Sequence, residues 1–201
     1  MFSGIIADAG MIKKVADREG GLRLTVATEV LGMDDVALGD SIAVNGVCLT
    51  VIAVDGNDFT VDVSRETLDC TTGLEQQGGH VNLEKAMRLS DRIGGHLVSG
   101  HVDGVGEVAA FNDIGESWRL VVRAPQALSK YIAVKGSITI NGVSLTVNHV
   151  AGNEFEVNLI PHTLEVTTLN ELEKGKRVNL EIDLIARYVE RMMQAEKEQN
   201  T

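Results

Sequence analysis

The side chains best suited to chemistry lie in one eight-residue phrase that the chain contains twice. The phrase VNGVCLTV at residues 44–51 returns as INGVSLTV at residues 140–147, with serine in the place of cysteine. Side chains two positions apart in a strand point to the same face, so Cys48 and Thr50 would lie together, opposite an apolar row. The pattern indicates a small polar ligand cradle in each copy, although strand propensity alone also accounts for a threonine there.

The two copies differ at three positions where the side-chain chemistry changes: Ser144 stands for Cys48, His101 for Ile5, and Asp183 for Ala86. Histidine has an unperturbed pKa of about 6.5, so His101 is a candidate acid or base, and a hydrogen-bonded structural histidine is the alternative. Asp183 directly precedes a helical pattern, where aspartate is a favoured N-cap, and capping and function can coexist. Cys48 would be a nucleophile if its thiolate were stabilised; a buried, inert cysteine is the alternative.

Several other kinds of site are not expected. The remaining histidines lack HExxH or comparable spacing, so the sequence predicts no metal site; these are His80, His96, His149 and His162. GVGEV at residues 104–108 is not a dinucleotide-binding fingerprint, and neither a GxSxG nor a P-loop motif occurs. Lys135 could reach the polar tail of a ligand, and a solvated surface lysine is the alternative.

Composition excludes further classes of protein. With 44% hydrophobic residues the chain can bury a core, and its formal net charge of -11 argues against a nucleic-acid groove. The two cysteines form no CxxC pair, so no zinc or disulfide framework is expected. The N-terminus lacks the features of a signal peptide, and no stretch reaches the roughly 18 apolar residues of a membrane span. We expect a soluble, reduced, cytoplasmic protein.

The repeated phrase belongs to a duplication that covers nearly the whole chain. With a shift of 96 positions, three further pairs of segments come into register, the last after a one-residue insertion: SGIIADAG (3–10) with SGHVDGVG (99–106), RETLDCTT (65–72) with PHTLEVTT (161–168), and HVNLE (80–84) with RVNLE (177–181). A period near 96 is too long for a solenoid, so each copy is a domain.

Each copy reads as a series of strands. Asn-Gly between alternating apolar residues is a strong hairpin signal, and DGND at residues 55–58 marks a second turn that AGNE repeats. Short strands with regular turns predict a small closed barrel, which has no open sheet edge. Near the end, apolar residues recur at helical spacing, which predicts a helix of about four turns; they are Leu184, Ile185, Tyr188, Val189, Met192 and Met193. The repeat is interrupted within residues 85–97, and Gly94-Gly95 there permits a bend.

Together these phrases resemble the riboflavin synthase family, alpha chain type. The resemblance rests on MFSGII, NGVCLTV, NGVSLTV, GGHLVSGHVDGVGEV (94–108) and LIPHTLEVTTL (159–169), and it extends from Met1 to about Tyr188. It implies an all-β fold of two similar six-stranded Greek-key barrels with a C-terminal α-helix. The expected domains are a lumazine-binding barrel at residues 1–97, a second at 98–186, and a trimerisation helix and tail at 187–201.

The resemblance also implies the reaction and the assembly. Two molecules of 6,7-dimethyl-8-ribityllumazine dismutate: one gives a four-carbon unit to the other, which yields riboflavin and 5-amino-6-ribitylamino-uracil. The family is a homotrimer held largely by its C-terminal helices, with each active site between the N-terminal barrel of one subunit and the C-terminal barrel of a neighbour. No metal, flavin or nicotinamide cofactor is implied, and a lumazine synthase shell around the trimer is left open.

The same resemblance assigns residues. The N-terminal ligand site is Gly4, Ile5, Ile6, Cys48, Leu49, Thr50, Asp62, Val63, Ser64, Arg65, Glu66, Thr67, Gly100, His101 and Val102. The C-terminal site is Lys135, Ser144, Leu145, Thr146, Ile160, Pro161, His162, Thr163, Leu164 and Glu165. In the reaction, His101 would take a proton from the C7 methyl group of the donor lumazine. Ser41 and Cys48 would assist nearby, and Thr146 and Asp183 would orient the acceptor.

Two rival functions use related folds. A non-catalytic lumazine- or flavin-binding antenna protein would have a degraded SGH segment, whereas Ser99, Gly100 and His101 are all present here. A flavoprotein oxidoreductase would need an appended nicotinamide-binding domain, for which 201 residues leave no room. The enzyme is therefore the favoured function.

Overall fold

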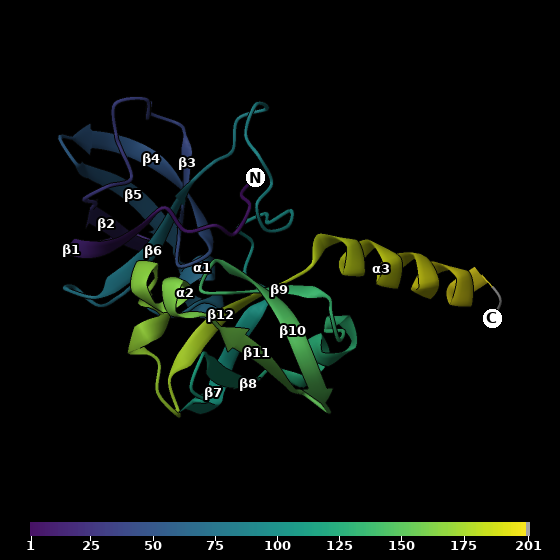
Figure 1. The fold of residues 1–201 in the computed structure, drawn as a ribbon. Coiled ribbons are helices and arrows are strands. Elements are labelled where there is room, and N and C mark those ends of the chain that lie inside the picture. The colour runs from purple at the N-terminus through teal and green to yellow at the C-terminus, as the bar shows by residue number, and fades with distance from the viewer. Residues whose placement is uncertain (200–201) are drawn as a thin grey trace.

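Two closed antiparallel barrels and a projecting helix make up the computed structural model, which describes residues 1–199 (Figure 1). The first barrel consists of β1 (Asp8–Arg18), β2 (Gly21–Ala27), β3 (Ser41–Val44), β4 (Val47–Asp55), β5 (Asp58–Ser64) and β6 (His80–Lys85). Its strands are ordered β1-β2-β5-β4-β3-β6, and β6 pairs with β1 to close it. The predicted six-stranded barrel is confirmed.

The second barrel repeats this topology. It consists of β7 (Gly104–Asp113), β8 (Trp118–Arg123), β9 (Ser137–Ile140), β10 (Val143–Ala151), β11 (Glu154–Leu159) and β12 (Arg177–Ile182). The cyclic order is β7-β8-β11-β10-β9-β12, which is the order of the first barrel with every strand number raised by six. Each barrel has its own apolar core, so the duplicated sequence is a duplicated domain.

The alternation predicted for the repeated phrase is present in both barrels. In β4, Val47, Leu49 and Val51 are buried, while Cys48 is half-buried and Thr50 is exposed. Strand β10 has the same pattern. Asn45 and Gly46 form the predicted two-residue hairpin turn, with φ of 48° and 80°, as a turn of this type requires.

Helices occur inside the repeats, where the sequence analysis expected only strands. Helix α1 (Arg65–Cys70) follows β5, and α2 (Pro161–Val166) follows β11; two 3-10 segments, η1 (Gln126–Tyr131) and η2 (Thr168–Glu171), lie in the second repeat. The side chain of Ser64 accepts a hydrogen bond from the amide of Thr67 and caps α1, and proline begins α2. Six residues are too few to show a helical period, which is why the pattern missed them.

The terminal helix α3 (Leu184–Gln199) confirms the predicted one and projects away from both barrels (Figure 1). The last two residues of the predicted tail, 200 and 201, lie outside the described residues. Lys130 of η1 pairs with Glu190 of α3 at 2.5 Å. No helix within residues 1–199 is long and apolar enough to cross a membrane.

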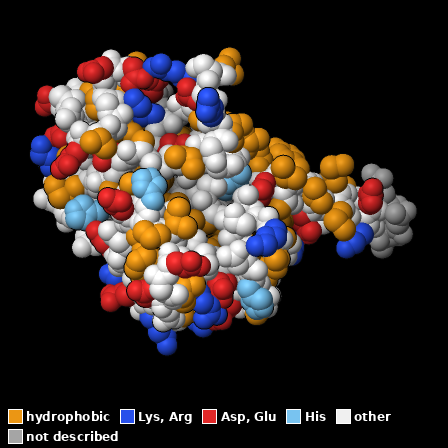
Figure 2. Space-filling view, in the orientation of Figure 1, with side chains coloured by type: hydrophobic (Ala, Val, Ile, Leu, Met, Phe, Trp, Pro, Cys, Tyr) orange, Lys and Arg blue, Asp and Glu red, His pale blue; other side chains and the backbone are white. Residues whose placement is uncertain are grey.

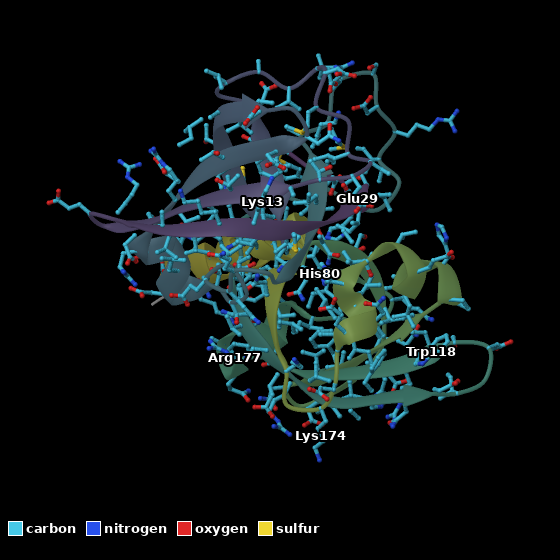
Figure 3. The ribbon with its side chains drawn as sticks, turned by 90° about the vertical axis from the view of Figure 1, so that its left-hand side faces the viewer. Lys13, Glu29, His80, Trp118, Lys174 and Arg177 are labelled. Atoms are coloured by element: carbon cyan, nitrogen blue, oxygen red, sulfur yellow. The ribbon has the colours of Figure 1, made fainter. Side chains whose placement is uncertain are left out.

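The two Asn-Gly turns meet where the barrels join. Asn82 Nδ2 donates to the carbonyl oxygen of Asn141 at 2.9 Å, and Asn179 Nδ2 donates to that of Asn45 at 3.0 Å. A Cβ on Gly46 would lie 2.7 Å from the nitrogen of Gly142 in the other turn. The hairpin turns are therefore buried contacts between the domains, and each domain makes the same contact to the other. His80, labelled in Figure 3, lies at the edge of this junction. Its Nδ1 is 2.7 Å from Glu171 Oε1.

Candidate functional site

The segment that precedes each barrel crosses to the opposite barrel. The amide of Ser144 in β10 donates to the carbonyl oxygen of Gly4 at 2.8 Å, and the amide of Cys48 in β4 donates to that of Gly100 at 2.9 Å. We call these crossing segments residues 3–6 and 99–102. Each therefore lies against the variable position of the phrase in the other repeat.

Only glycine fits at these two contacts. Gly4 has φ of 76°, and a Cβ there would lie 2.6 Å from Ser144 Cβ. Gly100 has φ of 81°, and its Cβ would lie 2.6 Å from Cys48 Cβ. A positive φ and a close backbone approach are the two circumstances that require glycine.

Two buried glutamates hold the crossing segments, and the sequence analysis did not single them out. Glu84 accepts from the amide and hydroxyl of Ser3 at 2.7 and 2.8 Å and from the amide of Gly4 at 2.9 Å. Glu181 does the same for Ser99, at 2.7 and 2.6 Å, and for Gly100 at 3.0 Å. Burial raises the pKa of both carboxyls. One sequence signal could have identified them: the same, otherwise buried, strand contains a glutamate in both repeats.

These contacts define two equivalent ligand cradles. The first cradle is Cys48 and Thr50 of β4 with crossing segment 99–102, and the second is Ser144 and Thr146 of β10 with segment 3–6. In both, a half-buried thiol or hydroxyl and an exposed threonine share a face. The structure brings the predicted Gly100, His101 and Val102 to Cys48 and Thr50, as the sequence analysis grouped them. It places Gly4, Ile5 and Ile6 at Ser144 of the second cradle, whereas the sequence analysis assigned them to the N-terminal site, because each segment crosses to the opposite barrel.

The remaining predicted contacts follow β5 and β11. Asp62 is paired with Arg18 and Arg23, the latter at 2.8 Å, so its carboxylate is already engaged on the barrel surface. Arg65 and Glu66 are exposed on α1, and the equivalent residues after β11 are largely exposed too; these are Ile160, Pro161, His162 and Glu165, with Thr163 half-buried.

Four predicted contacts have their side chains in the barrel cores. They are Leu49, Val63, Leu145 and Leu164. These residues can meet a ligand only through their backbone atoms. Lys135 is exposed with φ of 65°, and its Nζ lies 3.3 Å from Asn148 Oδ1.

Two cavities flank the crossing segments. One of about 680 Å³ is lined by residues of segment 3–6, of β3 and of the connection after β6, including Ser41, Lys85 and Arg88. The other, of about 500 Å³, is lined by residues of segment 99–102 and the start of α3, including His101 and Tyr188. Within one chain, Ser41 and His101 therefore line different cavities, although the sequence analysis expected Ser41 to assist His101.

Asp183 and a histidine that the sequence analysis set aside lie near the second cradle. Asp183 Oδ1 accepts from the amide of Ile185 at 2.9 Å, so the aspartate caps α3 as anticipated. His96 Nδ1 lies 2.8 Å from Ser144 Oγ. Burial lowers the pKa of His96, and the negative charge of Asp183 opposes that shift. His96 was missed because its partner is 48 positions away, and the spacing of histidines carries no signal for it.

Within residues 1–199, no three His, Cys, Asp or Glu side chains are grouped so that they could hold a metal ion. The chemistry that the described cradles themselves offer is hydrogen bonding by hydroxyl, thiol and backbone groups, with histidine beside each of them: His101 at the first and His96 at the second.

Comparisons with known proteins agree with this geometry. A family model described as "Lumazine binding domain" matches residues 3–86 and again residues 99–183. The chain is 44% identical over 198 residues to the riboflavin synthase of Photobacterium phosphoreum, which covers 98% of this chain and 91% of the relative. It is 45% identical over 203 residues to the riboflavin synthase of Brucella abortus, which covers 98% of this chain and 100% of the relative.

Solved structures of LumP are similar to the whole double barrel. The crystal structure of LumP complexed with riboflavin has a TM-score of 0.83 and 28% sequence identity, and covers 90% of this chain and 99% of that chain. The LumP complex with 6,7-dimethyl-8-(1'-D-ribityl) lumazine has a TM-score of 0.81, with the same identity and coverage.

Proposed function

The chain belongs to the riboflavin synthase family, and from this premise we propose how its two cradles divide the reaction. The reaction converts two molecules of 6,7-dimethyl-8-ribityllumazine into riboflavin and 5-amino-6-ribitylamino-uracil. One observation carries the proposal: a single chain holds two cradles of the same topology and hydrogen bonding, built from domains that both match a lumazine-binding model. Two like cradles suit a reaction that consumes two like molecules, each cradle holding one lumazine.

The differences between the cradles assign donor and acceptor chemistry to different groups. His101 is exposed on its crossing segment, and its ring makes no hydrogen bond or ion pair with any described residue, which suits a base that must reach the C7 methyl group of the donor lumazine. Ser41 and Cys48 assist, and Thr146 and Asp183 orient the acceptor. Holding the two lumazines in contact supplies much of the rate, since positioning alone can contribute about 7–11 kcal/mol to lowering a barrier.

The assembly we propose is a homotrimer with active sites between subunits. Helix α3 carries a row of large apolar side chains that the rest of the chain does not cover (Figure 2); these are Ile185, Tyr188, Val189, Met192 and Met193. Neighbouring copies of the same helix would bury this row. Such an assembly would also bring the first barrel of one chain, with its cradle at Cys48, to the second barrel of a neighbour, with its cradle at Ser144.

Conversion of the lumazine by the purified protein tests the function. Incubation with 6,7-dimethyl-8-ribityllumazine should produce riboflavin, followed by its fluorescence, with one riboflavin formed for every two lumazines consumed. Tight binding without product would contradict the enzyme and support the antenna alternative. Higher identity to the synthases (44–45%) than to LumP (28%) favours the enzyme.

A further inference from the structure

The ring of His96 is held tightly against the second cradle. Its Nδ1 lies 2.8 Å from Ser144 Oγ, and its amide donates to the carbonyl oxygen of Ser3 at 3.1 Å. A Cβ on the preceding residue, Gly95, would lie 2.2 Å from that same oxygen and 2.6 Å from Ser144 Cβ. The backbone of His96 and of the preceding Gly95 therefore packs against Ser3 and Ser144, which fixes the position of the ring relative to the serine.

The second ring nitrogen is left without a partner. Among the side chains that the structure describes, His96 Nε2 is the one buried nitrogen or oxygen that makes no hydrogen bond. Buried polar atoms are nearly always paired, so an unpaired one needs an explanation, and functional sites are a recurrent one. The charged group that acts on this ring is the carboxylate of Asp183, at the start of α3.

The first cradle has no equivalent of this arrangement. The counterparts of Ser144 and Asp183 are Cys48 and Ala86, and no histidine ring is hydrogen-bonded to Cys48 among the described residues. The second cradle thus has a serine, a histidine and an aspartate where the first has a cysteine and an alanine. This difference between the repeats therefore involves three side chains at one place: Ser144, His96 and Asp183.

We propose that His96 is a positioning residue of the second cradle, which accepts the hydroxyl hydrogen of Ser144 at Nδ1 and so directs the Ser144 oxygen lone pairs toward the bound lumazine. A hydroxyl has one hydrogen and two lone pairs, so donation to Nδ1 leaves the oxygen as an acceptor for a donor group of the ligand. The neutral ring then carries its own hydrogen on Nε2. The cysteine of the first cradle has no such partner, and the two lumazines are held by different hydrogen bonding.

The proposal rests on the riboflavin synthase function. Two measurements distinguish a failure of this proposal from a failure of that function. The first is the tautomer of His96, read from ¹⁵N-labelled imidazole by NMR on the full-length protein without substrate. We expect an unprotonated Nδ1 and a protonated Nε2. A proton on Nδ1 would overturn the proposal whatever the activity, whereas a wild-type protein that makes no riboflavin would contradict the function instead.

The second measurement compares variants in steady-state riboflavin formation. His96→Ala should lower kcat by about tenfold to a hundredfold with a smaller change in KM, because a misplaced contact group costs rate more than affinity. His96→Asn, whose side-chain oxygen can stand near the position of Nδ1, should recover part of the loss. His149→Ala is the matched control, an exposed histidine on β10, the strand that carries Ser144, and should leave kcat unchanged.

A double-mutant cycle gives the decisive comparison. If His96 acts through Ser144, then H96A should have little further effect in an S144A background, since interacting residues are not additive. An equal loss in both backgrounds, or full turnover in H96A itself, would overturn the proposal. Circular dichroism and thermal melting of each variant identify any that fail to fold, and in that event the NMR result alone decides.

Discussion

The amide of Cys48 donates a 2.9 Å hydrogen bond to the carbonyl oxygen of Gly100, which joins a strand of one barrel to the crossing segment of the other repeat. The equivalent bond joins Ser144 to Gly4 at 2.8 Å. Neither cradle is therefore complete within its own repeat. Residues 99–102 serve the first cradle although they precede the second barrel, so separated domains should lose ligand binding even if each folds.

Gly100→Ala should disturb the first cradle strongly. The new Cβ would meet Cys48 Cβ at 2.6 Å and Phe2 at 3.0 Å, and φ is 81°. We expect a loss of about 2–4 kcal/mol in the free energy of unfolding, combining backbone strain with overpacking. Gly20→Ala is the control, because its φ of 79° is almost the same and nothing lies within 4 Å of the added Cβ. If urea unfolding gave equal losses of unfolding free energy for Gly100→Ala and Gly20→Ala, packing against Cys48 would have no effect.

His101→Ala should lower riboflavin formation by about a hundredfold or more, the range typical of a general base, while ligand affinity changes little. His101 is exposed, and its removal leaves no core cavity. Stopped-flow turnover and fluorescence titration with riboflavin measure the two effects separately. Unchanged turnover would remove His101 from the mechanism.

Glu181→Gln tests the buried carboxylate that holds Ser99. Burial raises the pKa of Glu181 above its ordinary value of 4.5, so the folded protein binds this proton more readily than the unfolded chain. The contribution of Glu181 to stability is then fully present below pH 4.5 and lost as the pH rises through the raised pKa. The stability difference between wild type and E181Q should accordingly shrink as the pH rises from 4.5 through the raised pKa. A difference in unfolding free energy that grows with pH would contradict this sign.

Val189→Glu should dissociate the proposed trimer. Val189 lies in the exposed apolar row of α3, and a carboxylate there would have to be desolvated between helices. Sedimentation should show a trimer for wild type and smaller species for the variant, with the barrels still folded by circular dichroism. Arg191→Gln, a change at a polar position of the same helix, is the control and should stay trimeric. A wild-type monomer would contradict the assembly.

Asn179→Ala should weaken the junction between the barrels. Asn179 Nδ2 donates to Asn45 and Thr72 carbonyl oxygens at 3.0 and 3.1 Å, and its Oδ1 accepts from the amide of Thr72 at 2.8 Å. The variant leaves these buried groups without partners, and we expect a loss of about 2–4 kcal/mol. Exposed Asn112 on β7 provides the control substitution, expected to be neutral by thermal unfolding. Similar melting of the two variants would argue against the junction's importance.

Much of the fold could be predicted because its signals are local. The alternation around Cys48 and Thr50 sets which side chains face the core, and Asn45-Gly46 supplies the positive φ values of a tight hairpin. A side-chain period of two and a turn preference depend on a few neighbouring residues. The duplication then carried each prediction to the second barrel. The short helices α1 and α2 were missed because six residues make fewer than two turns, too few for a helical period to repeat.

The sequence by itself determined the two barrels, the terminal helix, and the face on which Cys48, Thr50 and their counterparts lie. Tertiary structure alone decided that each SG segment crosses to the opposite barrel, that Glu84 and Glu181 hold those segments, and that His96 meets Ser144. The physical reason is that these contacts join residues from 48 positions apart (His96 and Ser144) to 140 positions apart (Gly4 and Ser144), so they exist only once the barrels have closed and docked. The spacing of residues along the chain does not indicate which segments will meet when the barrels dock.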